Sequence, residues 1–186
     1  MMKRKINMMA LAGILSLLGY SVNAAAQNQA RADIKNAEGK SVGTAALRET
    51  KNGVLITVNV NGLPQGLHAV HIHAVGKCEG PDFTSAGGHF NPLNKKHGLK
   101  SPDGPHAGDL PDMYVNKDGV GRYEALMESI TLNSGATSVF DTDGSAIVIH
   151  ASADDNMTDP SGSSGDRIAC GILTKATTKN MINKRQ

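Results

Sequence analysis

The stretch Val54–Val60, with the sequence VLITVNV, decides the fold class of this chain. It is a short run of residues with high β propensity, and the dipeptides Asn52-Gly53 and Asn61-Gly62 flank it. Both dipeptides favour tight turns between neighbouring strands. The stretch therefore predicts one strand of an antiparallel sheet.

Four more short runs of this kind follow along the chain, and two of them come after an Asp-Gly pair. They are Ala69–His73, Val120–Met127, Ala146–Ile149 and Ile168–Leu173. Many short strands separated by Gly and Asn turns predict an all-β protein, built as an antiparallel sandwich or barrel.

Two segments interrupt this pattern, and we expect both to be long functional loops. Residues 76–113 hold many of the glycines and prolines without a long apolar run, and residues 151–167 are rich in Ser, Gly and Asp. Long segments without regular structure are uncommon in a compact domain unless they serve a function. A bound metal is the natural candidate for holding these loops in shape.

The composition fits a leader followed by one globular domain. The 186 residues are 39% hydrophobic and 19% charged, with 3% aromatic residues and no Trp, so aliphatic side chains must build the core. Three basic residues precede an apolar stretch that ends in small residues, which predicts a signal peptide over residues 1–24. Cleavage after Ala24 and cleavage after Ala26 both fit. We expect the domain over residues 25–174 and a polar, basic tail over residues 175–186.

The leader predicts export to the periplasm or the medium, with no membrane anchor, because its apolar stretch is too short to span a bilayer comfortably. Removing residues 1–24 takes away three of the 19 basic residues and none of the 17 acidic ones, which leaves 16 against 17. A charge so close to neutral, with no basic stripe, argues against a nucleic-acid partner.

The two cysteines, Cys78 and Cys170, lie far apart in the sequence. In an exported protein such a pair predicts a disulfide. A pair of metal-binding thiolates is the alternative, although no C-x-x-C spacing supports it.

The histidines fall into two groups or beside them, whereas incidental histidines would scatter. His71 and His73 alternate in an expected strand, so their side chains project from the same face, and His150 closes another strand. A set of imidazoles alone suits Cu²⁺.

The second group lies in the first long loop and contains His89, His97, His106 and Asp109. Three imidazoles and a carboxylate can close a tetrahedral site, which suits a structural Zn²⁺. The alternative is a polar loop that merely carries several histidines.

Five motifs, in this order along the chain, resemble the copper/zinc superoxide dismutase family. They are Gly66–His73 (GLHAVHIH), Ser85–Pro92 (SAGGHFNP), Lys95–Gly98 (KKHG), His106–Leu110 (HAGDL) and Gly165–Gly171 (GDRIACG). The first resembles a G-x-H-x-x-H-x-H signature, the fourth an H-x-G-D-L signature, and the last a G-x-R-x-A-C-G signature.

The resemblance covers residues 31–174 and implies a Greek-key β-sandwich or barrel of the immunoglobulin-like kind. It also implies one copper ion and one zinc ion per chain. Copper would be bound by His71, His73, His89 and His150. Zinc would be bound by His89, His97, His106 and Asp109. His89 would then bridge the two metals.

The implied activity is superoxide dismutation, in which two superoxide anions and two protons become dioxygen and hydrogen peroxide. The copper ion would alternate between oxidised and reduced forms, with His89 supplying a proton and Arg167 attracting superoxide beside the copper. Asp154 would join one ligand of each metal through their outer nitrogens. An ordinary loop aspartate is the alternative, which Asp155 next to it keeps open. His68 would be a buried scaffold residue.

The chain departs from the animal pattern of this family and resembles its bacterial exported branch. The loop of residues 151–166 contains no lysine but carries four aspartates. Lys77, Lys95, Lys96 and Lys100 are candidates for guiding the substrate instead. A monomer and a homodimer both fit the sequence. An exported metal-handling protein without activity is the main rival, but Arg167 and all four candidate copper ligands are present, which favours the enzyme.

Overall fold

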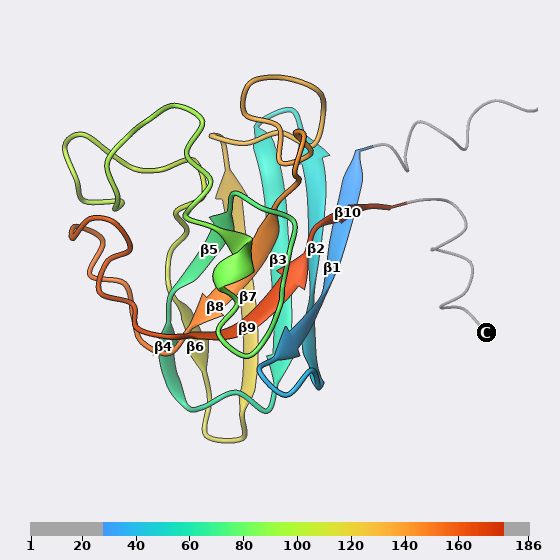
Figure 1. The fold of residues 1–186 in the computed structure, drawn as a ribbon, viewed down its shortest axis with the longest axis vertical. Helices are drawn as coiled ribbons and strands as arrows, with labels where there is room; N and C mark the ends of the chain where they lie inside the picture. Colours follow the sequence, from blue (N-terminus) through green and yellow to red (C-terminus); the bar gives the residue numbers. More distant parts are fainter. Residues whose placement is uncertain (1–27, 177–186) are drawn as a thin grey trace, which may run out of the picture.

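Antiparallel strands dominate the computed structural model, which describes residues 28–176 (Figure 1). The expected signal peptide lies outside these residues. Within them, ten strands form one sheet that curls into a barrel-like body, and the prediction of an antiparallel all-β fold is confirmed. The strands are β1 (Gln29–Asn36), β2 (Ser41–Thr50), β3 (Gly53–Asn61), β4 (Gly66–His68), β5 (Val70–His73), β6 (Met113–Val115), β7 (Val120–Met127), β8 (Ala146–His150), β9 (Arg167–Ile172) and β10 (Thr174–Lys175).

The order of the strands explains how the sheet closes. It runs β4-β6-β7-β3-β2-β1-β9-β8-β5, with β10 paired to β1. The two ends of this order, β4 and β5, are consecutive in the chain and separated only by Ala69. Because the chain leaves β3 and passes over β7 and β6 to reach β4, the connection is of the Greek-key type.

Strand β3 shows why the sequence folds this way. Val54, Ile56, Val58 and Val60 are all buried, while the residues between them are at least partly exposed. This alternation follows from the two-residue period of a strand, so one face packs into the core. A tight turn at Asn52 then joins β3 to β2, with Thr50 opposite Gly53. The expected strand at residues 54–60 is therefore present and extends one residue further at each end.

The domain extends slightly beyond its expected end at residue 174. Thr174 and Lys175 form β10, and Lys175 pairs with Ala30 of β1. The N–H of Ala176 also donates to the Gln29 carbonyl oxygen at 2.8 Å. The extension forms because β1 offers backbone groups at this edge that an extended segment can pair with. Residues 177–186 lie outside the described part of the chain.

Both expected loops are present, and they lie on the same side of the barrel (Figure 1). Residues 74–112 connect β5 to β6 and contain one short 3₁₀ helix, η1 (Thr84–Ala86). Residues 151–166 connect β8 to β9. The N–H of Lys100 in the first loop donates to the Asn156 carbonyl oxygen in the second at 3.0 Å, so the loops touch.

Candidate metal centre

The first loop is hydrogen-bonded along β5, and this contact starts the site. The N–H of Ile72 donates to the Gly108 carbonyl oxygen at 2.9 Å, and the Ile72 carbonyl oxygen accepts from the N–H of Phe90 at 2.8 Å. A Cβ at position 108 would lie 2.3 Å from the Ile72 carbonyl oxygen, so only glycine allows this close approach. The residues that follow Gly108 and precede Phe90 are thereby held against the strand.

This docking places loop residues beside the two histidines of β5. The backbone of His71 forms an isolated β-bridge with that of Asp109, and the backbone of His73 forms one with that of His89. His150 enters from the end of the neighbouring strand β8, whose residue Ile149 pairs with Val70. Four imidazoles therefore gather from two strands and one loop.

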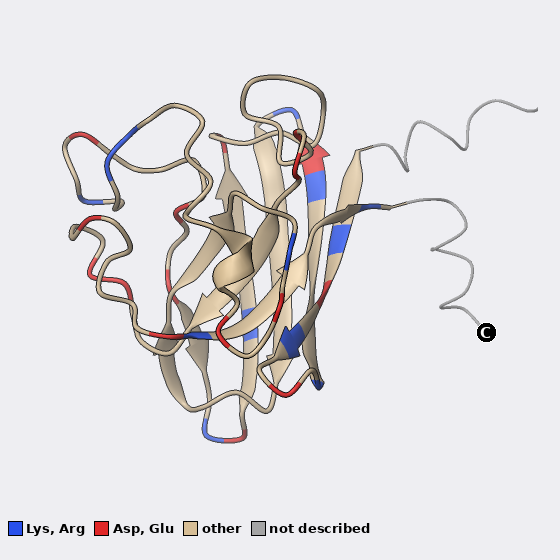
Figure 2. Ribbon diagram, in the orientation of Figure 1, with Lys and Arg blue, Asp and Glu red and all other residues tan. Residues whose placement is uncertain are grey.

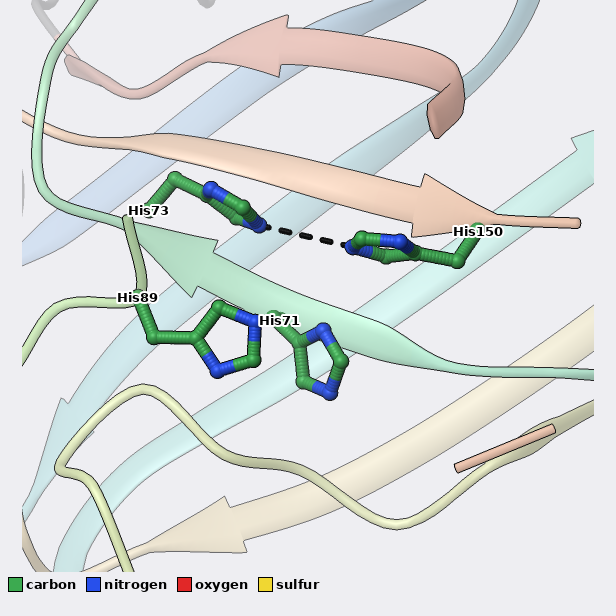
Figure 3. A group of neighbouring side chains, drawn as sticks. All are labelled: His71, His73, His89 and His150. Atoms are coloured by element: carbon green, nitrogen blue, oxygen red, sulfur yellow. Dashed lines mark hydrogen bonds between the residues drawn. The ribbon is translucent and has the colours of Figure 1, made fainter. Parts of the chain in front are cut away.

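The first group of side chains consists of four buried histidines (Figure 3). One nitrogen of each lies within 4.8 Å of the corresponding atoms of the others. Nε2 of His73 and Nε2 of His150 face each other at 3.4 Å (Figure 3). The members are His71, His73, His89 and His150.

The outer nitrogens of three of these rings meet oxygen acceptors. Nε2 of His71 lies 2.7 Å from an Asp154 carboxylate oxygen, and Nδ1 of His73 lies 2.9 Å from the Gly87 carbonyl oxygen. Nδ1 of His150 lies 3.2 Å from the Gly165 carbonyl oxygen. These acceptors hold the ring proton on the outer nitrogen and leave a lone pair on the inner one.

The second group closes around one carboxylate. Asp109 Oδ1 lies 2.8 Å from His89 Nδ1 and 3.3 Å from His106 Nδ1, and Oδ2 lies 3.1 Å from His97 Nδ1. The Nδ1 atoms of His89 and His106 are 3.4 Å apart. Three nitrogens and a carboxylate oxygen therefore converge on one point.

These spacings fit a tetrahedral metal ion. Ligands bound to Zn²⁺ at about 2.0–2.1 Å would lie about 3.3 Å from one another. The four donor separations given above run from 2.8 to 3.4 Å, and all donors of the group lie within 4.8 Å of one another. In addition, Nδ1 of His71 and Nε2 of His89 are buried without a hydrogen-bond partner. A buried polar atom without a partner is costly, and a metal ion would take up its lone pair.

His89 belongs to both groups, and its two nitrogens face in different directions. Nδ1 faces Asp109, whereas Nε2 lies on the side of His71, whose ring centroid is 3.9 Å away. One imidazole therefore separates the two groups of ligands, as a bridging ligand must.

Burial sets the protonation of this site. Burial lowers the pKa of His71 to about 4 and that of His150 to about 3. Burial alone would raise the pKa of Asp109, but hydrogen bonds from His89 and the N–H of Gly98 outweigh it and lower the value to about 2. At neutral pH His71 and His150 are therefore neutral imidazoles and Asp109 is a carboxylate, the forms in which these groups bind metals.

The Asp154 carboxylate contacts one histidine of each group through the outer nitrogen of its ring. Its Oδ2 lies 2.7 Å from His71 Nε2, and its Oδ1 lies 2.9 Å from His97 Nε2. Burial would raise its pKa, but the hydrogen bonds from these histidines hold it well below the usual range. Asp155 next to it bonds to Met157 and Thr158 within its own loop. Of the two aspartates, Asp154 is the one that contacts both groups.

Arg167 lies beside the four-histidine group. Its guanidinium donates to the Phe83 carbonyl oxygen at 2.7 Å and to the Gly87 carbonyl oxygen at 2.8 Å. Gly87 also accepts from His73, so one carbonyl oxygen links the guanidinium to this group. Burial lowers the pKa of Arg167 from its usual value, which is so high that the guanidinium remains charged.

The two cysteines form a disulfide, with 5.7 Å between their Cα atoms. The bond ties the start of the first loop to β9, next to the buried side chains of Phe83 and Val148. The alternative of metal-binding thiolates is excluded in this structure. His68 is buried, with Nδ1 2.7 Å from the His150 carbonyl oxygen and Nε2 2.9 Å from the Pro64 carbonyl oxygen, as expected of a scaffold residue.

Several partners of the site carry no signal in the sequence. Phe83, Gly87 and Gly165 act through backbone carbonyl oxygens, which every residue possesses. Asp112 and Asp159 accept the N–H groups of Asp154 and His97. Their spacing from the ligands could have suggested a role, but a loop aspartate is too common to single out.

The fold and the site together define a class: a Greek-key β protein with two adjoining groups of side chains that could hold metal ions and one histidine common to both. Comparisons with known proteins agree with this class. The family model for copper/zinc superoxide dismutase matches residues 41–173. Superoxide dismutase [Cu-Zn] 2 of Aquifex aeolicus is 46% identical over 170 residues, which cover 89% of this chain and 99% of that protein.

Solved structures show the same relationship. A superoxide dismutase-like protein from Bacillus subtilis is 43% identical, with a TM-score of 0.75 over 77% of this chain and 97% of that one. The Cu/Zn superoxide dismutase from Brucella abortus is 28% identical, with a TM-score of 0.64 over 77% of this chain and 98% of that one.

The chain belongs to the copper/zinc superoxide dismutase family. The predictions of the family, of an oxidoreductase that dismutates superoxide, and of copper and zinc as cofactors are thereby confirmed. Within residues 28–176, no helix has the length and apolar character needed to cross a membrane.

Proposed function

We propose that the two groups of side chains are the copper and zinc sites of this dismutase. The proposed copper ligands are His71, His73, His89 and His150. The proposed zinc ligands are His89, His97, His106 and Asp109. The observation that carries the proposal is the orientation of the imidazole rings. The outer ring nitrogens of His71 and His73 contact oxygen acceptors, and Nδ1 of His89 faces Asp109 of the second group. The other nitrogen of each of these rings points toward the middle of the first group.

When bound, copper supplies the one-electron chemistry of dismutation, and zinc supplies positive charge and support for the loop. Arg167 attracts the superoxide anion, because a guanidinium stays charged and its two carbonyl contacts hold it beside His73. His89 is the proposed proton carrier through Nε2, which lies on the copper side with no hydrogen-bond partner. Asp154 fixes the orientation of His71 and His97.

The location that we propose is the periplasm, reached by export. The disulfide supports an oxidising compartment, and the relatives named above come from bacteria. The charge and hydropathy pattern of residues 1–24, which lie outside the described part of the chain, adds to this argument.

The oligomeric state of the protein is a separate question. Sedimentation of the metal-loaded protein would distinguish the monomer from the homodimer.

A metal-handling protein without activity is the competing proposal. It has no need for a guanidinium held beside the copper ligands, whereas a dismutase needs one to capture an anion. The contacts of Arg167 with Phe83 and Gly87 therefore favour the enzyme.

Variants specific to each group test the assignment. After loading with one equivalent of each metal, His150→Ala should lose copper and keep zinc, and His106→Ala should lose zinc and keep copper. His89→Ala should weaken both. Native mass spectrometry counts the ions, and circular dichroism checks that each variant is folded. Loss of both metals from His150→Ala and from His106→Ala alike would contradict two separate sites.

A further inference from the structure

Asp159, in the loop of residues 151–166, reaches across to the first loop. Its Oδ1 accepts the backbone N–H of His97 at 2.7 Å, and its Oδ2 lies 2.9 Å from Lys96 Nζ. We propose that Asp159 is a positioning residue for the zinc site, which acts by holding the backbone of His97. This inference rests on the proposed assignment of His97 to zinc.

His97 is held by the second loop at two separate points. Its backbone N–H donates to Asp159, while its ring Nε2 lies 2.9 Å from Asp154 Oδ1. The remaining ring nitrogen, Nδ1, then lies 3.1 Å from Asp109 Oδ2. Because backbone and ring are both fixed, the direction of the nitrogen offered to zinc is fixed as well.

Close packing of the two backbones adds to this attachment. Gly98 has a φ of +104°, and a Cβ there would lie 2.2 Å from the Asn156 carbonyl oxygen. The same oxygen accepts the N–H of Lys100 at 3.0 Å. Contacts on both sides of His97 therefore come from residues 154–159, so the position of this ligand depends on the second loop.

The bond to the backbone N–H should matter more than the ion pair with lysine. The side chains of Lys96 and Asp159 are 66% and 40% exposed, and exposed ion pairs contribute little. The hydrogen bond from His97 is also the largest of the causes that lower the pKa of Asp159, ahead of Lys96. The loop of residues 151–166 carries acidic residues (Figure 2), and the bond from the His97 N–H gives Asp159 a structural role among them.

The test compares matched variants of the full chain. Asp159→Ala removes the acceptor, and we expect zinc to bind about 10-fold more weakly, as for other groups that orient metal ligands. Asp159→Asn keeps an oxygen that accepts the N–H and should restore most of the affinity. Lys96→Met removes only the ion pair and should bind zinc as the natural chain does. Affinity is read by competition with a chromophoric chelator.

Two further measurements separate this role from general damage to the loop. Asp155→Ala is the control, because the Asp155 carboxylate bonds within its own loop, to the N–H groups of Met157 and Thr158. It should keep the natural zinc affinity. Hydrogen exchange of the His97 amide should become faster in Asp159→Ala and stay slow in Asp159→Asn.

Unchanged zinc affinity and unchanged His97 exchange in Asp159→Ala would overturn this inference alone. An equal loss of affinity in Asp155→Ala would overturn it too, since the effect would then come from disorder of the loop. If the natural chain bound no zinc, the ligand assignment would fail and this inference with it.

Discussion

The carbonyl oxygen of Gly87 accepts two hydrogen bonds, one from His73 Nδ1 and one from the Arg167 guanidinium. A single backbone atom therefore orients a proposed copper ligand and holds the positive charge that we propose attracts the substrate. Since Phe83 supplies the second acceptor for Arg167, the guanidinium has little freedom to leave this place.

Replacing Arg167 with Ala should separate capture of the anion from binding of the metal. We expect the second-order rate constant for superoxide to fall at least about 10-fold, because a fixed positive charge is lost from the approach to the copper. Copper content should stay at the natural level, since Arg167 is not a ligand. The rate constant of Arg167→Lys should lie between those of the natural chain and Arg167→Ala, because lysine keeps the positive charge but lacks the fixed, planar set of donors.

Stopped-flow decay of superoxide and elemental analysis of the same samples check this expectation. A fall in rate matched by an equal loss of copper would show that Arg167 supports the metal site rather than the substrate.

The buried histidines predict how the stability of the metal-free protein depends on pH. Burial lowers the pKa of His71 to about 4 and that of His150 to about 3. In the unfolded chain both histidines have a pKa of about 6.5, so below that pH the unfolded state binds protons that the native state does not. Stability should therefore fall as the pH decreases from about 6.5 toward 4, by about 1.4 kcal/mol per pH unit for each histidine.

Urea unfolding of the metal-free protein at several pH values between 7.5 and 5 measures this slope. His150→Gln removes one titrating group and should make the dependence shallower. Equal stability at pH 7.5 and pH 5 would contradict the buried, neutral state of these rings.

At the scale of elements, the disulfide fastens the start of the first loop to β9. Cys78 and Cys170 are separated by 92 residues in the sequence. A cross-link over such a distance stabilises a protein by about 4–5 kcal/mol in the chain-entropy model. The double variant Cys78→Ala/Cys170→Ala should be less stable by roughly this amount.

Guanidinium unfolding of the two metal-free proteins tests that figure. Reductant should destabilise the natural chain and leave the double variant unchanged, which controls for other effects of the reductant. Equal midpoints for the natural chain and the double variant would show that packing alone holds the loop.

The sequence predicts some elements better than others, for physical reasons. β3 is a run of β-type residues flanked by two turn dipeptides, and β7 follows the turn dipeptide Asp118-Gly119, so the sequence predicts both strands nearly in full. β4 and β6 have only three residues each, which is too short for a period to show. The sequence does not predict β1 and β2, because small or polar residues, such as Ala45 and Thr44, break up their apolar pattern.

The same contrast holds for the site. Histidines and Asp109 could be named in advance, because few residue types bind metals and their motifs resemble a known family. The acceptors on Phe83, Gly87 and Gly165 could not, since a backbone carbonyl oxygen has no identity in a sequence. The depth of burial of His71 also follows only from the packed structure.

At the scale of the whole molecule, the barrel supplies a rigid wall and the two loops supply the rest of the site (Figure 1). The loop of residues 74–112 carries basic and acidic residues, whereas the loop of residues 151–166 carries acidic residues and no lysine (Figure 2). Lys96 is paired with Asp159 and Lys100 Nζ lies 3.5 Å from the Asp155 carbonyl oxygen, so both are weaker candidates for guiding the substrate than Lys77 or Lys95. The two loops contact each other, the strands and the proposed ligands. We therefore expect the loops and the metal sites to take up their final arrangement together.

The most direct test measures metal content and dismutase activity on the same purified protein, before and after loading with copper and zinc. We expect one copper ion and one zinc ion per chain, together with rapid removal of superoxide that is absent from the metal-free protein. Full occupancy of both sites without activity would contradict the account, and would identify the chain as a metal-handling protein with the fold of a dismutase.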